Sequence, residues 1–199
     1  MIALIIGYGS AGKRHYNILK KEKKIKKIFV FTKQKINNIN SIKDLDDIKK
    51  INPDYIVIAN ETYKHISFVK YFESNFINKI IIVEKPLYEK YNAFKIKKNK
   101  YIISYNLRFH PTKKFIKDNF DLKKIFYIES ESSSYLPFWR KKTNYKHSYS
   151  ASKKKGGGVL LDLSHEIDYV SYLFNNFKII LNFSKKISNL NFKSDDYAM

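Results

Sequence analysis

Short apolar runs alternate with amphipathic segments over the first half of the chain. Five strands are expected, over Ile2 to Ile6, Lys27 to Thr32, Tyr55 to Ala59, Lys79 to Val83 and Tyr101 to Tyr105. Helical spacing predicts helices from Ser10, over Ile42 to Ile51 and Thr62 to Glu73, and in the Lys-rich stretch after Pro86. Apolar strands that alternate with helices predict a doubly wound, mostly parallel sheet covered on both faces, which is an α/β fold.

The regular alternation of apolar strands and helices ends at Pro111. A short helix precedes a long, partly alternating strand over Lys123 to Ser134 and a polar, aromatic loop from Tyr135 to Lys155. A helix of about four turns and a strand over Lys178 to Ile187 follow. This order predicts an α+β domain with an open sheet, so we place one domain at residues 1–110 and a second at 111–199.

Net charge and composition narrow the function classes. The chain carries a formal charge of +21, but only three of its 39 basic residues are arginine and the lysines are spread along its length. We therefore expect a solvated Lys-rich surface and no nucleic-acid partner. Cysteine is absent, which excludes disulfides and thiolate metal sites and fits a cytoplasmic protein. The apolar runs are too short to span a bilayer, so no membrane partner is expected. No metal site is expected either.

All six glycines fall in two clusters, and the first has the spacing of a nucleotide-binding turn. Gly7, Gly9 and Gly12 lie between the first predicted strand and the helix that begins with Ser10 and Ala11. In this context the spacing predicts a tight turn, close approach of a pyrophosphate, and close packing of helix on strand. The amides at the start of the helix would face the phosphates.

The end of the second predicted strand bears on cofactor choice. An acidic residue about 20 residues beyond the glycines usually binds the adenosine ribose. Here Thr32 holds that position and Lys33 and Lys35 follow it. A hydroxyl and two ammonium groups accommodate a 2′-phosphate, so the sequence favours NADP over NAD.

The second cluster, Gly156 to Gly158, opens a helix that carries titratable side chains. Asp162, His165 and Asp168 are spaced to share one face with Tyr169. The opposite face is expected to pack on the core and consists of Leu160, Leu163, Ile167, Val170 and Phe174. A histidine between two carboxylates suits acid–base chemistry, because histidine titrates near neutral pH. A solvated helix face is the alternative.

Four segments in this order resemble one known family. They are GYGSAGKRH, VEKPL at Val83 to Leu87, YNLRFHP at Tyr105 to Pro111, and GGGVLLDLSHEID at Gly156 to Asp168. They are similar to those of the glucose–fructose oxidoreductase and inositol dehydrogenase relatives, the Gfo/Idh/MocA family. The resemblance implies a Rossmann domain followed by an α/β domain whose open sheet often makes oligomer contacts. It also implies hydride transfer between NAD(P) and a sugar carbon.

The resemblance further implies roles for individual residues. Lys85 would lie beside the nicotinamide and hydrogen-bond the reacting oxygen. His165 would be the general acid and base, and Asp162 would orient it or bind a substrate hydroxyl. Two residues instead of the usual three separate Asp162 from His165, which leaves the division of labour between them open. The cofactor would also contact Ala59, Asn60, Thr62, His65 and Glu84.

The loop before the second glycine cluster resembles a branch of this family that acts in surface-sugar and nucleotide-sugar pathways. Trp139, Arg140 and Tyr149 offer stacking faces and a planar donor for a sugar or phosphate, and Tyr145 belongs to the same set. Arg108 is a further candidate for substrate contact. Packing of these aromatic side chains onto their own domain is the alternative.

The sequence stops at Met199, where relatives continue into further strands. We therefore expect an incomplete second domain, and a homo-oligomer for a full-length form. The leading hypothesis is an NAD(P)-dependent sugar oxidoreductase. The alternative is a catalytically incomplete fragment that retains only nucleotide binding.

Overall fold

The computed structural model describes residues 1–199 except 91, 140–143 and 175–177. The chain divides into two units, Met1–Ser104 and Tyr105–Met199. The predicted boundary after residue 110 lies inside the second unit. The reason is that Tyr105 and Arg108 form hydrogen bonds with Ser164 and Asp168 of that unit.

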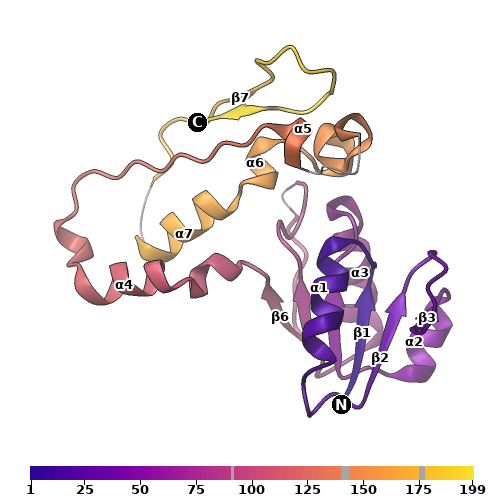
Figure 1. Ribbon diagram of the computed structural model, residues 1–199. Coiled ribbons are helices and arrows are strands. Elements are labelled where there is room, and N and C mark those ends of the chain that lie inside the picture. The colour runs from indigo at the N-terminus through magenta and orange to yellow at the C-terminus, as the bar shows by residue number, and fades with distance from the viewer. Residues whose placement is uncertain (91, 140–143, 175–177) are drawn as a thin grey trace. The chain divides into compact units, whose positions relative to one another are not determined.

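The first unit is built on a six-stranded parallel sheet in the order β3-β2-β1-β4-β5-β6 (Figure 1). Its strands are β1 (Ile2–Ile6), β2 (Lys27–Phe31), β3 (Asn40–Ile42), β4 (Tyr55–Ile58), β5 (Ile80–Val83) and β6 (Lys100–Ile103). The predicted doubly wound α/β fold is confirmed. The strand order reverses between β1 and β4, and ligands of such sheets bind outside the carboxyl ends of the strands at this point.

Helices cover both faces of the sheet, because the central strands carry apolar side chains on both of their faces. The helices are α1 (Ser10–Leu19), α2 (Leu45–Ile51) and α3 (Thr62–Asn75). Leu4 and Ile6 pack in one buried cluster with Phe72 of α3, whereas Ile5 packs in the other with Leu19 of α1. A strand buried on both faces must be apolar throughout, which is why β1 reads as an unbroken apolar run.

The Lys-rich helix predicted after Pro86 is absent from the described residues between β5 and β6. The backbone there is held by side chains of α3 and of the segment itself. Glu73 Oε1 accepts hydrogen bonds from the amides of Lys97 and Lys98, both at 2.5 Å. Asn99 Nδ2 donates to the carbonyl of Phe76 at 2.9 Å. The two bonds to Glu73 take amides that a helix would use, and the Asn99 bond ties the segment to the end of α3, so the prediction was wrong.

The second unit consists of short helices joined by extended segments. The α-helices are α4 (Pro111–Asn119), α5 (Leu136–Trp139), α6 (Val159–Asp162) and α7 (His165–Leu173), and the 3-10 helices are η1 (Asn106–Phe109), η2 (Leu122–Lys124), η3 (Tyr145–His147), η4 (Tyr149–Ala151) and η5 (Lys153–Lys155). Two strands, β7 (Ser184–Lys185) and β8 (Tyr197–Ala198), pair antiparallel. No helix in the described ranges is both long and apolar enough to cross a membrane.

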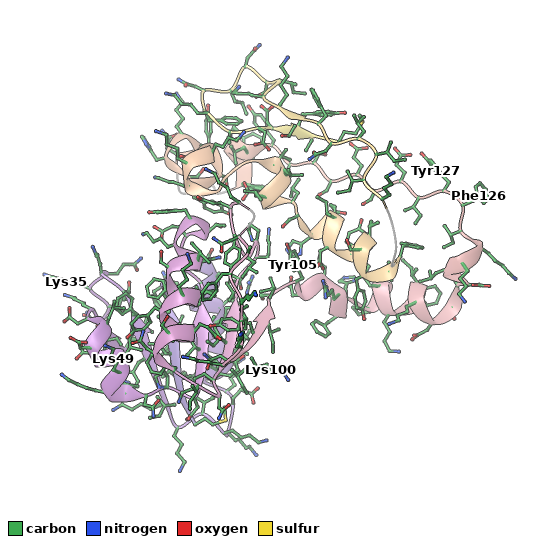
Figure 2. All side chains as sticks on the ribbon, turned by 180° about the vertical axis from the view of Figure 1, so that it is seen from behind. Lys35, Lys49, Lys100, Tyr105, Phe126 and Tyr127 are labelled. Atoms are coloured by element: carbon green, nitrogen blue, oxygen red, sulfur yellow. The ribbon has the colours of Figure 1, made fainter. Side chains whose placement is uncertain are left out.

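The two long strands predicted for this unit are largely not formed. Residues 125–134 are extended but, among the described residues, pair with no neighbouring strand, and of 178–187 only Ser184–Lys185 pairs. A strand requires a hydrogen-bonded neighbour, which an alternating sequence alone does not supply. Phe126 and Tyr127 on the first of these segments are exposed (Figure 2).

The predicted four-turn helix is divided into α6 and α7. The helical backbone is interrupted at Leu163, with φ −103° and ψ 21°. The predicted core-facing stripe was wrong at Ile167, which is exposed, whereas Asp162 and Asp168 of the predicted polar face are buried. Asp168 is buried because its carboxylate is bound by Arg108.

Candidate functional site

The first glycine cluster forms a tight turn at the carboxyl end of β1, beside the end of β4. Gly7 has φ +90°, and a Cβ there would lie 2.8 Å from the Cα of Asn60. A Cβ on Gly12 would lie 2.2 Å from the carbonyl oxygen of Gly7. Glycine is therefore required at both positions, by conformation at Gly7 and by space at Gly12.

The same turn leaves room for a ligand. Nothing lies within 4 Å of the position that a Cβ on Gly9 would take, and Gly9 precedes the first turn of α1, where Ser10 is exposed and Ala11 half-buried. That first turn carries no acidic side chain. Asn60 at the end of β4 has a buried Oδ1 for which the described residues supply no hydrogen-bond partner. An open turn at a helix start beside an unsatisfied amide oxygen fits a dinucleotide.

The carboxyl end of β2 presents basic side chains to solvent. Thr32 is buried, and its Oγ1 accepts a hydrogen bond from the amide of Gln34 at 3.2 Å. Lys33 and Lys35 are exposed, and Figure 2 shows Lys35 at the edge of this unit. The exposed charged groups at this strand end are thus ammonium groups, and the Thr32 hydroxyl is buried.

His65 joins two turns at the carboxyl edge of the sheet. It is 1% exposed, with Nδ1 3.1 Å from the carbonyl oxygen of Pro86 and Nε2 3.1 Å from that of Asn60. Burial lowers its pKa below the usual value, although the carbonyl contacts act in the opposite direction. Ala59 and Thr62, which flank Asn60, are also buried. The structure thus gives His65 backbone partners, and its predicted contact with the cofactor stays a prediction.

Glu84 connects the end of β5 to α1. Its Oε1 accepts hydrogen bonds from His15 Nε2 at 2.6 Å and from Arg14 Nη2 at 3.0 Å. Burial opposes ionisation of Glu84, but the hydrogen bond and charge of His15, together with Arg14, hold its pKa below the usual value. The helix that follows the glycine turn is thereby tied to the residue that precedes Lys85.

Lys85 lies between two fixed residues. Glu84 before it is held by α1, and Pro86 after it, across a cis peptide bond, is contacted by His65. The Lys85 side chain is half-buried at the carboxyl end of β5. This is the edge of the sheet that also carries the glycine turn and Asn60, so the first unit brings the predicted cofactor-binding residues and Lys85 to one edge.

In the second unit, Asp162 ends α6 and His165 begins α7. The His165 ring packs edge-on against Tyr105 with centroids 5.7 Å apart, and Tyr105 donates a hydrogen bond to Ser164 at 3.4 Å. The interruption at Leu163 changes the angular relation that one continuous helix would impose on Asp162 and His165. Both residues stay candidates for acid–base chemistry.

Arg108 is engaged by α7. Its Nε donates to Asp168 Oδ2 at 2.8 Å and its Nη2 to Oδ1 at 2.5 Å, and its guanidinium lies 5.3 Å from the Tyr172 ring centroid. The hydrogen bond to Asp168 raises the Arg108 pKa. This two-bond pair fixes η1 to α7. A substrate contact by Arg108 would have to use the remaining donors of its guanidinium.

A pocket of about 270 Å³ in the second unit brings together two predicted site residues, Asp162 and Trp139. Ser150, Asp195 and Asp196 also line it. Tyr149 lies next to Ser150, half-buried, at the start of η4. Arg140, predicted to bind substrate, lies outside the described residues.

Comparisons with known proteins agree with this description. Residues 113–198 match the family described as the oxidoreductase family, C-terminal alpha/beta domain, of Gfo/Idh/MocA proteins. The resemblance to the Gfo/Idh/MocA family is confirmed. The sequence has no significant match among curated proteins.

Solved structures share the fold across both units. An NAD-binding protein from Listeria innocua is 19% identical with a TM-score of 0.68, and 98% of this chain covers 60% of it. Myo-inositol 2-dehydrogenase from Lactobacillus plantarum is 21% identical with a TM-score of 0.71, with coverage of 87% and 56%. The WlbA dehydrogenase from Bordetella pertussis, in complex with NADH and UDP-GlcNAcA, is 11% identical with a TM-score of 0.75, with coverage of 99% and 65%. The chain thus spans about 60% of the length of such relatives.

The structure adds residues that the Gfo/Idh/MocA motifs did not single out. They are His15, which binds Glu84, and Ser150, which lines the pocket. Asp168 was grouped with His165 for acid–base chemistry but is the partner of Arg108. The GKRH segment offered one signal, because a histidine and an arginine one turn after a phosphate turn can reach a carboxylate at the carboxyl edge of the same sheet.

Proposed function

We propose that the first unit binds a nicotinamide dinucleotide and that the chain catalyses hydride transfer to or from a sugar or nucleotide-sugar. The main support is the turn Gly7–Gly12 at the switch point of the sheet, open at Gly9 and next to the unsatisfied Asn60 Oδ1. The oxidoreductase family match and the NADH complex of WlbA support the same reading. In this proposal the cofactor supplies or accepts the hydride.

The chain's own residues would bind and orient. The amides at the start of α1 would hold the pyrophosphate, as helix N-termini do. Thr32 and Lys33 would contact the adenosine ribose. The preference for NADP is part of the proposal and rests on the exposed Lys33 and Lys35, since ammonium groups attract a 2′-phosphate and no carboxylate stands there to repel it.

Proton handling would fall to three residues. Lys85 would donate a hydrogen bond to the reacting oxygen and so stabilise negative charge that develops on it. His165 would take up the hydroxyl proton during oxidation and return it during reduction, and Asp162 would orient His165 or accept a hydrogen bond from a substrate hydroxyl. Arg14 and His15 hold Glu84, and His65 contacts Pro86, so both neighbours of Lys85 are fixed. Glu84 and His65 would therefore act as positioning residues for Lys85.

The test is a fluorescence titration with NADPH and NADH, followed by turnover with a panel of sugars and sugar nucleotides. Lys85→Met and His165→Ala should leave cofactor binding nearly unchanged and reduce turnover by at least 100-fold, in line with the loss of one acid–base or oxyanion group, which costs roughly 10²–10⁴. Lys100→Met is the matched control, because Lys100 is an exposed lysine at the amino end of β6 (Figure 2). Turnover that survives both site substitutions would refute the assigned mechanism.

Nucleotide binding without turnover is the second candidate function. It is favoured by the open glycine turn and the unsatisfied Asn60 Oδ1, which both lie in the first unit and require no residue of the second. Saturable NADPH binding with no reduction or oxidation of any sugar in the panel would establish it. We also propose a cytoplasmic location, because the chain matches an oxidoreductase family and contains no cysteine.

A further inference from the structure

The pocket of the second unit is framed by elements that are far apart in the sequence. Its wall is formed by the segment Ser134–Leu136 with Trp139, by the start of α6, and by the segment that leads from Ile187 to Asp196. Binding pockets for drug-sized ligands measure roughly 300–1,000 Å³. At about 270 Å³ this pocket suits a single ring and not a whole sugar nucleotide.

One polar group in the pocket wall lacks a protein partner. Ser150 is 2% exposed, and the described residues supply no hydrogen-bond partner for its buried Oγ. Its backbone is fixed, because Ser194 Oγ donates to the Ser150 carbonyl at 2.6 Å and a Cβ on Gly157 would lie 2.7 Å from the Ser150 Cα. A buried hydroxyl without a partner destabilises the fold unless something satisfies it. A ligand hydroxyl or amide in the pocket would do so.

Three of the residues that line the pocket are aromatic. Tyr135, Trp139 and Phe192 line the pocket, and the Tyr135 ring packs edge-on against Phe138 at 4.9 Å. The C–H face of a pyranose ring is apolar while its rim carries hydroxyl groups. A lining that combines aromatic side chains with hydroxyl and carboxylate groups matches both parts of such a ring.

The charged side chains among the described lining residues are all acidic. Asp162, Asp195 and Asp196 line it, and none of the described lining residues is basic. The Asp195 carboxylate accepts from the amide of Leu160 at 3.3 Å and keeps lone pairs for a ligand. The Asp196 carboxylate is engaged by the amides of Ile187 and Ser188 and by the Ser188 hydroxyl, so it contributes mainly its negative charge. Carboxylates accept hydrogen bonds from sugar hydroxyls but repel a second carboxylate at close range.

We propose that this pocket binds a neutral or amino pyranose ring and rejects a uronic acid. The ring stacks on Trp139, and one of its polar groups satisfies Ser150 Oγ. This inference rests on the proposed function only in treating the bound sugar as the substrate. Binding itself requires no nicotinamide cofactor, so it is measured on the chain without one.

Trp139 is the single tryptophan of the chain, so intrinsic tryptophan fluorescence reports on this wall of the pocket. The full-length 199-residue chain is titrated with N-acetylglucosamine and, separately, with glucuronate at constant ionic strength. We expect a saturable change in fluorescence with N-acetylglucosamine and at least tenfold weaker binding of glucuronate. Equal binding of the two sugars, or no binding of either by the folded chain, would overturn the inference.

Two variants separate binding from folding. Ser150→Ala should weaken N-acetylglucosamine binding about tenfold without lowering the unfolding temperature, because it removes a buried group that has no protein partner. Ser171→Ala is the matched control, since the Ser171 hydroxyl donates to the Ile167 carbonyl outside the pocket and sugar binding should not change. Asp195→Asn keeps an oxygen for the Leu160 amide, removes one charge and should bring glucuronate closer to N-acetylglucosamine in affinity. Unchanged binding in Ser150→Ala would contradict the assigned contact.

The two experiments distinguish failure of the pocket proposal from failure of the proposed oxidoreductase function. Sugar binding without any NADPH or NADH binding would support the pocket and refute the oxidoreductase. Turnover of a sugar with no response of Trp139 would support the oxidoreductase and refute the pocket.

Discussion

Substitution of Gly12 by alanine should destabilise the first unit, whereas the same substitution at Gly9 should not. A Cβ on Gly12 would lie 2.2 Å from the carbonyl oxygen of Gly7, and ordinary contacts of a Cβ begin at 3.4 Å. The start of α1 would therefore have to move by about 1 Å away from a backbone atom in a turn that is itself fixed against Asn60. Overpacking costs about 1–3 kcal/mol when side chains can adjust, and a backbone obstacle places this case near 3 kcal/mol.

The expected result is a fall in unfolding temperature of about 12–24 °C for the unit of residues 1–104, since 1 kcal/mol corresponds to roughly 4–8 °C at this size. Gly9 is the matched control, because nothing lies within 4 Å of its Cβ position and its backbone, with φ −75° and ψ −164°, suits alanine. Gly9→Ala should keep the unfolding temperature and weaken NADPH binding by crowding the pyrophosphate. The assays are circular dichroism melting and NADPH fluorescence. A Gly12→Ala protein whose unfolding temperature lies within about 2 °C of that of the parent would refute the steric argument.

Three further predictions concern buried polar groups of the first unit. Glu73→Ala should cost about 2–4 kcal/mol in urea unfolding, because it leaves the amides of Lys97 and Lys98 without a carboxylate partner; an unchanged unfolding midpoint would contradict it. The pKa of Glu84 is lowered in the folded chain, so its contribution to stability is present above pH 4.5 and is lost as the pH falls through the folded pKa; Glu84→Gln should flatten that acid limb of the stability curve. The pKa of His65 is also lowered, so the unfolded chain binds a proton first and stability should fall as the pH drops below 6.5; a His65→Gln variant with the same slope would show that another group titrates.

The core of the first unit could be predicted from the sequence because local patterns determine it. A strand buried on both faces is an apolar run, and a helix over such a sheet shows an apolar face. β1, β4 and β5 meet this condition, whereas β3 (Asn40–Ile42) is short and polar and was not expected. The segment after Pro86 looked helical by composition, but Glu73 binds two of its amides and holds its backbone in another form.

Sequence motifs predicted where the site residues lie along the chain, but not which residues hold them in place. The glycine spacing located the turn at Gly7–Gly12, and the VEKPL segment located Lys85. Two pairs join positions about 60 to 70 residues apart: Glu84 with His15 holds the residue before Lys85, and Asp168 with Arg108 holds η1 against α7. No periodicity connects such positions, so their pairing becomes visible only in three dimensions. The same holds for the pocket, where Ser150 meets the segment around Asp195 through the close packing of Gly157 and Gly158.

The end of β2 has an evolutionary consequence. Thr32 is buried and its hydroxyl is already bonded to the Gln34 amide, whereas Lys33 and Lys35 are exposed and bear no packing role. Exposed substitutions usually change stability by no more than about 0.5 kcal/mol. Under the proposed function, selection could therefore exchange one nicotinamide cofactor for the other through these lysines alone, with the sheet and its core untouched. Cofactor choice would drift faster than the fold, and closely related chains could differ in it.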